Sequence, residues 1–339
     1  MKDIMYKILF DVMGYENPLS HAIEAARLFV KKHRDVSITL VGDANLIKPL
    51  LNSENEFMII DTPEYISQDD SVFSIRHKRN SSLALAFNEL KTNNEYQGLL
   101  SAANSAVFVY YAYTIIGLLD NVKKPAFMPF IPTLNGIGLN MLDVGAAIDV
   151  DEYDLMNFAI MANVIAKKRV TNPVIKTLNI ASEDVKGNDL TKKTNSLMKN
   201  HMQELGLNYQ GFIEPKNILE YPADIIITDG FSGNLVLKTI EGTAKSISGY
   251  LKKEYKKKRF FLAALFSLPI FKKMKQKFDY RHNAGAFVLG AKSILVKTHG
   301  SADREQFGSS LAMLYDNIKN NALDEINNQL KLFYDKQQK

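Results

Sequence analysis

Short apolar segments alternate with longer segments of helical periodicity along almost the whole chain. The apolar segments predict strands, which lie near Tyr6–Phe10, Ser37–Val41, Phe57–Ile60, Gly98–Ser101, Ala126–Ile131, Asn140–Val144, Ile175–Ile180, Tyr209–Gly211 and Asp224–Thr228. The periodic segments predict helices, which cover Pro18–His33, Ser81–Thr92, Ala106–Leu119, Glu152–Lys168, Leu190–Leu205 and Leu235–Lys258. Such alternation is typical of βαβ units, so the pattern predicts an α/β fold with a mostly parallel sheet and helices on both faces.

One strand-to-helix connection has the composition of an anion site. Residues 223–242 run from an apolar strand into a helical pattern through a loop that contains Asp229, Gly230, Ser232, Gly233 and Asn234. Glycines let the backbone approach a ligand closely, and the free N–H groups at the start of a helix favour negative charge. The same composition also suits a structural turn at the end of a buried strand, because such turns recur in α/β folds. A phosphate loop and a structural turn are both compatible with this segment.

Four more predicted strands end in loops with small polar or glycine residues. These residues are Asp11 and Gly14, Ser101 and Asn104, Asp143 and Gly145, and Glu183, Lys186 and Asn188. Ligands of open α/β sheets bind at the carboxyl ends of strands. The five loops therefore predict one composite pocket, with donors from Asn104, Lys186, Asn188 and Asn234 and acids from Asp11, Asp143, Glu183 and Asp229.

Composition narrows the class of protein. The chain has 339 residues, of which 46% are hydrophobic and 23% charged, as is ordinary for a soluble globular protein. It has no cysteine, which excludes disulfides, thiolate metal sites and a cysteine nucleophile, and fits a reducing cytoplasm. The N-terminal residues lack the apolar core of a signal peptide, and no apolar run reaches the ~18 residues of a membrane-spanning helix. No metal-binding spacing of acids appears, so we expect neither a metal nor another cofactor.

The net charge of +5 conceals a strongly basic segment. Residues 252–277 contain ten Lys or Arg and one Glu, whereas the rest of the chain holds 32 basic and 36 acidic residues. Basic clusters at both ends of this segment flank the apolar stretch 260–271. We expect a helical hairpin over 245–282, within a single α/β domain spanning 1–339, that docks peripherally on an anionic membrane surface. The expected membrane contacts are Phe260, Phe261, Leu262, Leu265 and Phe266. Packing against a dimer partner and docking of an acidic partner protein are alternatives for this segment.

Several sequence blocks, in order along nearly the whole chain, carry a family resemblance. The most specific are TDGFSGN at Thr228–Asn234 and LKTIEG at Leu237–Gly242. Further blocks are Asp11–Gly14, Lys78 with Asn80–Ser82, Leu142–Gly145, Asn179 with Ser182–Asp184 and Lys186–Asn188, and Lys297 with His299–Asp303. On these residues the chain resembles the PlsX family, the acyl-acyl carrier protein:phosphate acyltransferases of bacterial phospholipid synthesis.

The resemblance implies a fold, an activity and partners. The implied fold is a three-layer α/β/α sandwich like those of phosphotransacetylase and isocitrate dehydrogenase, in a homodimer. The implied activity is transfer of a fatty acyl group from acyl carrier protein to inorganic phosphate, which gives an acyl phosphate. The alternatives are a catalytically degenerate membrane-bound scaffold of lipid synthesis and a small-molecule phosphotransacetylase. Nucleic acid is not an expected partner, since no nucleic-acid motif accompanies the charge.

The implied chemistry assigns roles to the strand-end loops. A phosphate dianion is already a nucleophile near pH 7, so the protein must chiefly position it and stabilise the oxyanion. We expect phosphate to contact Asp229, Gly230, Ser232, Gly233 and Asn234, with Asp143, Gly145 and Gly14 in adjoining loops. We expect Lys186 and Asn188 to donate hydrogen bonds, Asn104 to face the oxyanion, and His299 to protonate the leaving thiolate or bind phosphate. The alternatives are a solvated loop lysine, a turn histidine, and capping roles for Asp143 and Asp229.

The sequence departs from the family pattern in these same loops. Tyr15 and Glu16 follow the first block in place of Gly-Asp, Ala103 and Ala106 stand where the family has glycines, and Ala147 stands where it has asparagine. Alanine replaces glycine without cost only where φ is negative and there is room for Cβ. We expect an active, divergent member, with Tyr15 as the departure of greatest concern.

Overall fold

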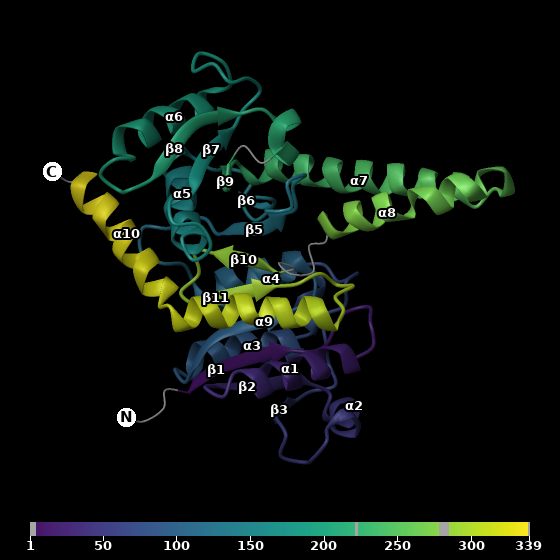
Figure 1. Cartoon of the computed structure of the whole chain (residues 1–339). Coiled ribbons are helices and arrows are strands. Elements are labelled where there is room, and N and C mark those ends of the chain that lie inside the picture. Colours follow the sequence, from purple (N-terminus) through teal and green to yellow (C-terminus); the bar gives the residue numbers. More distant parts are fainter. Residues whose placement is uncertain (1–4, 221–222, 278–284, 338–339) are drawn as a thin grey trace.

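The computed structural model describes residues 5–220, 223–277 and 285–337, and the strands of this part form one sheet (Figure 1). The strands are β1 (Tyr6–Asp11), β2 (Val36–Gly42), β3 (Met58–Asp61), β4 (Tyr96–Ser101), β5 (Ala126–Ile131), β6 (Leu139–Leu142), β7 (Val174–Leu178), β8 (Asn208–Ile213), β9 (Ile225–Ile227), β10 (Ala286–Leu289) and β11 (Ile294–Lys297). Their order across the sheet is β3-β2-β1-β4-β11-β10-β5-β6-β9-β7-β8. Among the described residues, neighbouring strands pair in parallel, except for the two pairings of β10 and the pairing of β5 with β6, which are antiparallel.

Helices cover both faces of the sheet. They are α1 (Ser20–Lys32), α2 (Ala44–Ile47), α3 (Ser82–Thr92), α4 (Ser105–Tyr111), α5 (Glu152–Ala166), α6 (Asp189–His201), α7 (Gly230–Tyr255), α8 (Phe261–Lys277), α9 (Arg304–Lys319) and α10 (Ala322–Gln337), with short 3₁₀ turns and a π-helical turn at Ala112–Ile116. Successive residues of β1 point to opposite faces. Ile8 and Phe10 join the core beneath α1, α5 and α9, whereas Leu9 joins a separate core beneath α3 and α4. The layers are therefore helix, sheet and helix, as the pattern predicts.

The predicted strands and helices are confirmed to within a few residues at most boundaries, with two differences. The helix predicted over Ala106–Leu119 is α4 followed by the π-helical turn, and it ends at Gly117, whose φ is +81°. The helix predicted to begin at Leu235 begins at Gly230. The carboxylate of Asp229 accepts a hydrogen bond from the N–H of Ser232 at 2.7 Å, and this N-cap starts the helix despite the low propensity of its glycines.

The antiparallel strands divide the sheet into two groups of opposite direction. β10 is antiparallel to β11 and to β5, and β5 is antiparallel to β6. β1, β4 and β11 therefore run one way, and β6, β7 and β9 run the other way. The strand-end loops consequently form separate clusters, and the structure does not gather them at one edge as the sequence pattern predicts.

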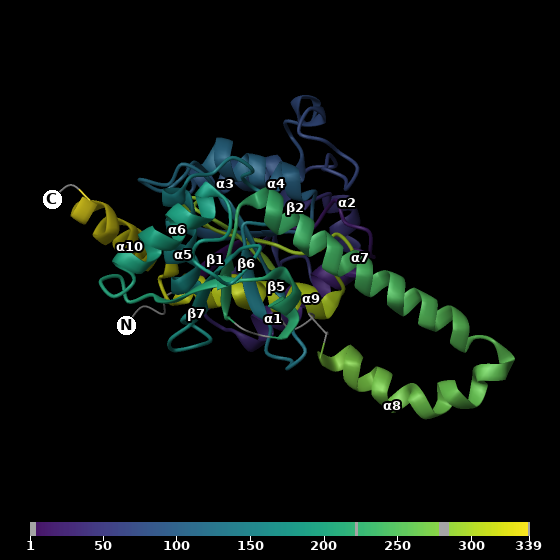
Figure 2. The same ribbon diagram turned by 90° about the horizontal axis from the view of Figure 1, so that it is seen from above.

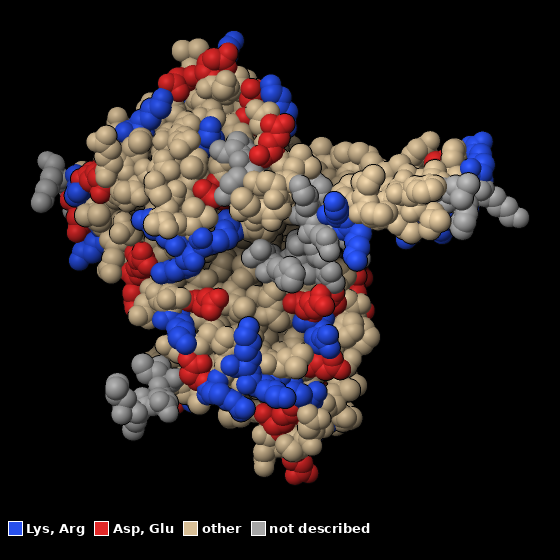
Figure 3. Space-filling model, in the orientation of Figure 1, with Lys and Arg blue, Asp and Glu red and all other residues tan. Residues whose placement is uncertain are grey.

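A long helical arm extends from the body of the protein. α7 leaves the sheet, turns at the 3₁₀ segment Lys258–Phe260, and α8 returns beside it (Figures 1 and 2). At the far end, Tyr255 donates a hydrogen bond to Ser267 at 3.2 Å and packs edge-on against Phe271. Uncharged side chains cover most of the arm seen in Figure 3, and Lys and Arg gather near its tip. None of the helices in the described residues is long and apolar enough to cross a membrane. The last residues of the predicted hairpin, 278–282, lie outside the described residues.

Candidate functional site

Gln68 joins three loops at the carboxyl ends of β1 and β4 and beyond β11. Its side-chain Nε2 donates hydrogen bonds to the carbonyl oxygens of Gly14 at 2.6 Å and Ala102 at 2.8 Å. Its backbone carbonyl oxygen accepts a hydrogen bond from Nδ2 of Asn104 at 2.8 Å. Its side chain also lies against Gly300, where an added Cβ would stand 2.7 Å from Cδ of Gln68. We name these loops, with His299, the β1–β4–β11 cluster. No sequence pattern points to Gln68, because its partners are far away along the chain.

Local geometry fixes the backbone of this cluster. Gly14 has a φ of +74°, and a Cβ at this position would stand 2.0 Å from the carbonyl oxygen of Ile66, so only glycine fits. Oδ1 of Asn104 caps α4 by accepting from the N–H groups of Ala106 and Val107. Asn104 therefore has one amide hydrogen left after its bond to Gln68, and its oxyanion role stays a prediction.

Asp11 is a buried carboxyl group at the base of the cluster. It is 1% exposed and accepts hydrogen bonds from the Ser101 hydroxyl at 2.7 Å and the Met13 N–H at 3.3 Å. Burial raises the pKa of Asp11 to about 6, and the Ser101 hydrogen bond opposes this rise. The group is therefore held inside the protein by neutral donors, and it organises the ends of β1 and β4.

His299 presents a defined tautomer. Its Nδ1 accepts the backbone N–H of Ser301 at 3.2 Å and lies 2.8 Å from the Ser301 hydroxyl. Because a backbone N–H can only donate, Nδ1 carries no proton and the neutral ring holds its proton on Nε2. Burial lowers the pKa of His299, and the nearby charge of Lys297 lowers it further. At pH 7 the ring is therefore a neutral Nε2–H donor, which suits hydrogen bonding to an anion.

Asp143 organises the second group of loops. Its Oδ1 accepts the N–H groups of Phe127, Gly145 and Ala146 at 2.8–3.1 Å, and its Oδ2 accepts that of Ala147 at 2.6 Å. The side chain is fully buried, and burial raises its pKa to about 6 despite these bonds. All of these contacts are within the protein, which indicates a positioning role for Asp143; its contact with phosphate stays a prediction.

The start of α7 packs directly on this turn. A Cβ at Gly233 would stand 2.0 Å from the carbonyl oxygen of Asp143, and one at Gly230 would stand 2.5 Å from that of Ala147. The close approach made by these two glycines is therefore to the protein's own backbone. Gly145 faces Asn234, whose Cγ would be 3.6 Å from an added Cβ. We name residues 143–147 and 229–234 the β6–β9 cluster.

The loop after β7 carries Lys186 and Asn188. Asn179 holds this loop by donating from Nδ2 to the carbonyl oxygens of Ala181 and Lys186, both at 3.1 Å. Asn188 caps α6 by accepting the N–H of Thr191 at 2.9 Å. The side chains of Lys186 and Asn188 are exposed, so both can reach a ligand from solvent. Whether they do stays a prediction.

α7 connects the two named clusters. It begins in the β6–β9 cluster, and Val236, Leu237 and Ile240 pack on the core beneath β6 and β9. Further along, the charges of Lys238 and Glu241 act on the pKa of His299, which places this part of α7 near the β1–β4–β11 cluster. The candidate site therefore consists of two loop clusters with one helix between them.

The departures from the family pattern are accommodated locally. Tyr15 turns toward α9, where its ring packs edge-on against Phe307 at 5.0 Å between centroids and its hydroxyl donates to the carbonyl of Pro18. Among the described residues, the non-glycine positions of positive φ are Asn121 and Asn321. Ala103, Ala106 and Ala147 are therefore in conformations that alanine adopts without strain.

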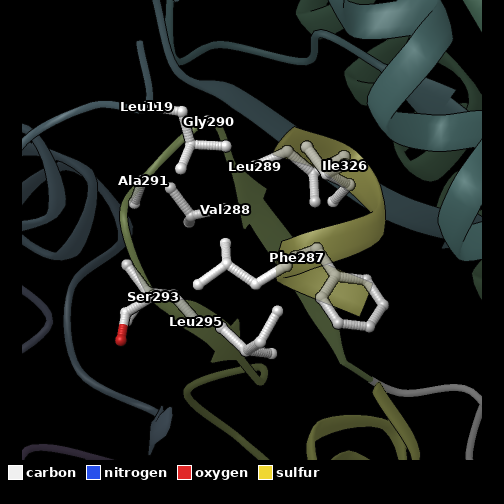
Figure 4. A pocket seen from close by; sticks show the side chains of 11 residues that line it. Leu119, Phe287, Val288, Leu289, Gly290, Ala291, Ser293, Leu295 and Ile326 are labelled. Carbon is white, nitrogen blue, oxygen red and sulfur yellow. The ribbon is translucent and has the colours of Figure 1, made fainter. Parts of the chain in front are cut away.

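A small pocket, shown in Figure 4, lies elsewhere in the molecule. It is lined by the largely apolar residues of β10, β11 and the start of α10, including Phe287, Leu295 and Ile326. Its volume of about 10 Å³ leaves room for one water at most. No group of three or more His, Asp or Glu side chains in the described ranges could hold a metal ion. The strand-end clusters thus remain the candidate site.

Comparison with known proteins identifies the family of this chain. The "Fatty acid synthesis protein" family model matches residues 6–322. The chain belongs to this family. It is 54% identical to a protein named phosphate acyltransferase from Ureaplasma urealyticum, over 97% of this chain and 98% of the relative. It is 44% identical to a phosphate acyltransferase from Malacoplasma penetrans, over 91% and 93% of the two chains. The resemblance stated from the sequence blocks is therefore confirmed.

Solved structures confirm the fold class. A phosphotransacetylase from Streptococcus pyogenes aligns with a TM-score of 0.60 at 15% identity, covering 96% of both chains. A branched-chain phosphotransacylase from Enterococcus faecalis aligns with a TM-score of 0.53 at 14% identity, covering 93% of this chain and 99% of the other. At these identities the likeness concerns the fold alone.

Proposed function

We propose that this protein transfers a fatty acyl group from acyl carrier protein to inorganic phosphate and so makes an acyl phosphate for phospholipid synthesis. The observation that carries this proposal is the near-full-length identity to proteins named phosphate acyltransferase. The fatty acid synthesis family model supports the acyl donor class. The absence of cysteine fits a mechanism in which phosphate itself attacks the thioester.

The site chemistry follows from what this reaction requires. Phosphate attacks the thioester carbonyl, the carbonyl oxygen becomes an oxyanion, and the thiolate leaves. Fixed donors stabilise the oxyanion more than they stabilise the ground state. The Nε2–H of His299 is one such donor, and as a neutral ring it can donate a hydrogen bond to phosphate or to the departing thiolate. Lys186, Asn188, Ser232 and Asn234 supply further donors from the other loops.

The activity is tested by incubating the protein with acyl-acyl carrier protein and phosphate and measuring acyl phosphate. We expect product that depends on both substrates, with the rate falling at least tenfold in Lys186→Ala and Asn234→Ala while the circular dichroism spectrum is unchanged. Full activity in both variants contradicts the site assignment. No product from the wild type favours the degenerate scaffold, and product only from acetyl-coenzyme A favours a small-molecule phosphotransacetylase.

We further propose that the chain is one acyltransferase domain whose hairpin, 245–282, docks peripherally on the cytoplasmic face of an anionic membrane. Apolar side chains on the arm are exposed to solvent: Leu265 at 53%, Phe266 at 79%, Leu268 at 58% and Ile270 at 68%. Exposed basic residues flank them on both sides: Lys252, Lys253, Lys256, Lys257, Arg259, Lys272 and Lys273. Apolar insertion and basic side chains together provide two signals for binding to anionic lipid. The side chains of Phe261 and Leu262 lie outside the described ones, so their part in this contact stays a prediction.

Vesicle flotation tests the membrane contact. Vesicles containing phosphatidylglycerol should carry the wild-type protein at low salt, and binding should weaken at high salt because exposed charges are screened. Phe266→Ser should bind more weakly. Met58→Ser is the matched control, since Met58 is 69% exposed but lies on β3, outside the arm. Wild-type protein that fails to float at either salt concentration contradicts the membrane role.

We also propose a homodimer, on the basis of the family resemblance alone. Sedimentation equilibrium of the full chain should give twice the monomer mass of 38.2 kDa. A concentration-independent monomer contradicts this proposal.

A further inference from the structure

Lys297 is a buried lysine with almost no hydrogen-bond partners. It ends β11, is 6% exposed, and donates from Nζ to the carbonyl oxygen of Thr298 at 2.7 Å. An ammonium group has three donors, and among the described residues this carbonyl is the single acceptor for it. No carboxylate of the described residues forms an ion pair with it. Buried charges in proteins are ordinarily paired, because an isolated one loses its hydration without compensation.

The position of Lys297 places this charge in the β1–β4–β11 cluster. Lys297 lies opposite Ser101 in the parallel pairing of β11 with β4, and the N–H of Thr298 donates to the carbonyl of Ser101 at 2.9 Å. Since Nζ binds the carbonyl of the next residue, the ammonium lies at the carboxyl end of β11, where the turn that holds His299 begins. In the sequence, Lys297 stands out only as part of a family block.

The surroundings of Lys297 are electropositive. The charge of Lys238 on α7 acts on both Lys297 and His299, and the charge of Lys297 acts on His299. Burial, followed by the charge of Lys238, lowers the pKa of Lys297 to about 8. Glu241 neutralises Lys238 in part through an ion pair of 2.8 Å. A buried lysine beside the positive charge of Lys238 is unfavourable without a counter-ion, and an anion bound between the two would remove this cost.

We propose that Lys297 is the cationic ligand of an anion site between the carboxyl end of β11 and α7, and that this site binds inorganic phosphate. The identity of the anion rests on the proposed function, in which phosphate is the acyl acceptor. The neutral His299, with its proton on Nε2, adds a donor from the same turn. The site thus joins a full charge to a directed hydrogen bond, a combination suited to a compact dianion.

Thermal unfolding with added phosphate, at constant ionic strength, tests the site without using activity. A ligand that binds only the native state raises the unfolding midpoint as its concentration rises. We expect this increase in the wild type, its loss in Lys297→Met, and its partial retention in Lys297→Arg. Lys292→Met is the matched control, because Lys292 lies before β11, is exposed and pairs with Asp120 at 3.4 Å. This control should keep the full phosphate effect.

The stability of Lys297→Met without phosphate separates a binding role from a structural one. Methionine has a similar length and removes a buried charge that has no carboxylate partner, so this variant should be at least as stable as the wild type. In the enzyme assay its KM for phosphate should rise about 10- to 100-fold, the range expected for one charged hydrogen bond, with a smaller change in KM for the acyl donor. Unchanged phosphate protection, or unfolding of Lys297→Met in buffer alone, overturns the proposal.

The two proposals fail in different ways. If the wild type makes no acyl phosphate but its phosphate protection depends on Lys297, the anion site stands and the activity is rejected. If the wild type is active and Lys297→Met keeps its phosphate protection and KM, the activity stands and the site is rejected.

Discussion

Replacing Gly233 by alanine should destabilise the protein by about 2 kcal/mol. An added Cβ would stand 2.0 Å from the carbonyl oxygen of Asp143 and 2.8 Å from Cγ2 of Thr228. The nearest of these contacts is with backbone, which cannot rotate away as a side chain can, so the overlap is relieved only if the start of α7 moves. Overpacking of this kind costs ~3 kcal/mol. Alanine returns about 1 kcal/mol through its higher helix propensity, which leaves the net loss.

Gly242 provides a matched control in the same helix. A Cβ at this position meets nothing within 4 Å. Gly242→Ala should therefore stabilise the protein by ~0.5–1 kcal/mol, because only the propensity effect remains. The two substitutions are chemically identical, so a difference of about 3 kcal/mol between them reports the packing of α7 on the 143–147 turn alone.

Urea unfolding followed by circular dichroism at 222 nm measures both effects. The midpoints should shift in opposite directions with a common slope m. The displaced α7 start should also lower kcat/KM in Gly233→Ala, because Ser232 and Asn234 lie on it. The reasoning is refuted if Gly233→Ala matches Gly242→Ala in stability and loses only phosphate binding. In that case the glycine serves the approach of a ligand, as the sequence pattern first suggested.

Three further predictions concern the β1–β4–β11 cluster. The pKa of Asp11 is higher in the folded protein than its ordinary value of 3.8, so its ionisation destabilises the protein as pH rises from about 4 through about 6. The free energy of unfolding of Asp11→Asn, measured in urea, should exceed that of the wild type at pH 7, and this difference should become about 1 kcal/mol smaller when the pH is lowered to 5. A difference that does not change with pH contradicts this. Gln68→Ala removes two hydrogen bonds to loop carbonyls, worth ~1 kcal/mol each, and should lower kcat/KM about 10- to 30-fold with a small change in the urea midpoint; unchanged kinetics would show that the loops hold without it. Tyr15→Gly restores the family residue and removes the contact with Phe307, so its free energy of unfolding should be about 2–3 kcal/mol lower than that of the wild type. It should gain no activity in the acyl phosphate assay, and a more active variant contradicts the accommodation of Tyr15.

The sequence predicts the fold well where local signals agree. Strands such as β9 are continuous apolar runs between turn residues, and α5 is preceded by Asp151, which caps it together with Asp154. The pattern left β10 and β11 unassigned, because each is a four-residue apolar run with no periodicity to separate strand from helix. These two strands, together with β5, set the reversal of direction within the sheet. The sequence therefore did not predict that the strand-end loops fall into two groups, and a single composite pocket formed by both groups stays a prediction.

The candidate site was also predicted only in part from the sequence. The loops that the sequence selected are the loops that the structure places at strand ends, and Gly14, Asn104, His299, Asp143 and Asn234 all lie in the two clusters. The sequence does not tell a residue that binds a ligand from one that supports its neighbours. Asp143 has the composition of a binding residue, yet four backbone N–H groups occupy it. The roles of Gln68 and Lys297 depend on residues that are distant in sequence and that the fold brings beside them, so the sequence alone does not reveal these roles.

In the part of the chain that the structure describes, the helix α7 is the one element shared by the β6–β9 cluster and the arm, and it passes near the β1–β4–β11 cluster. Its 26 residues correspond to about 39 Å of α-helix, and its first turns are packed on the 143–147 turn with no room for a methyl group. Its middle, at Lys238 and Glu241, lies within electrostatic reach of His299 and Lys297. Because α7 is also packed through Ile240 on the core beneath β6 and β9, its segment near Lys238 is held against the body of the protein, and the exposed arm begins beyond it. Docking of the arm should therefore leave the charge around bound phosphate unchanged, so the phosphate KM should be the same in free and vesicle-bound protein.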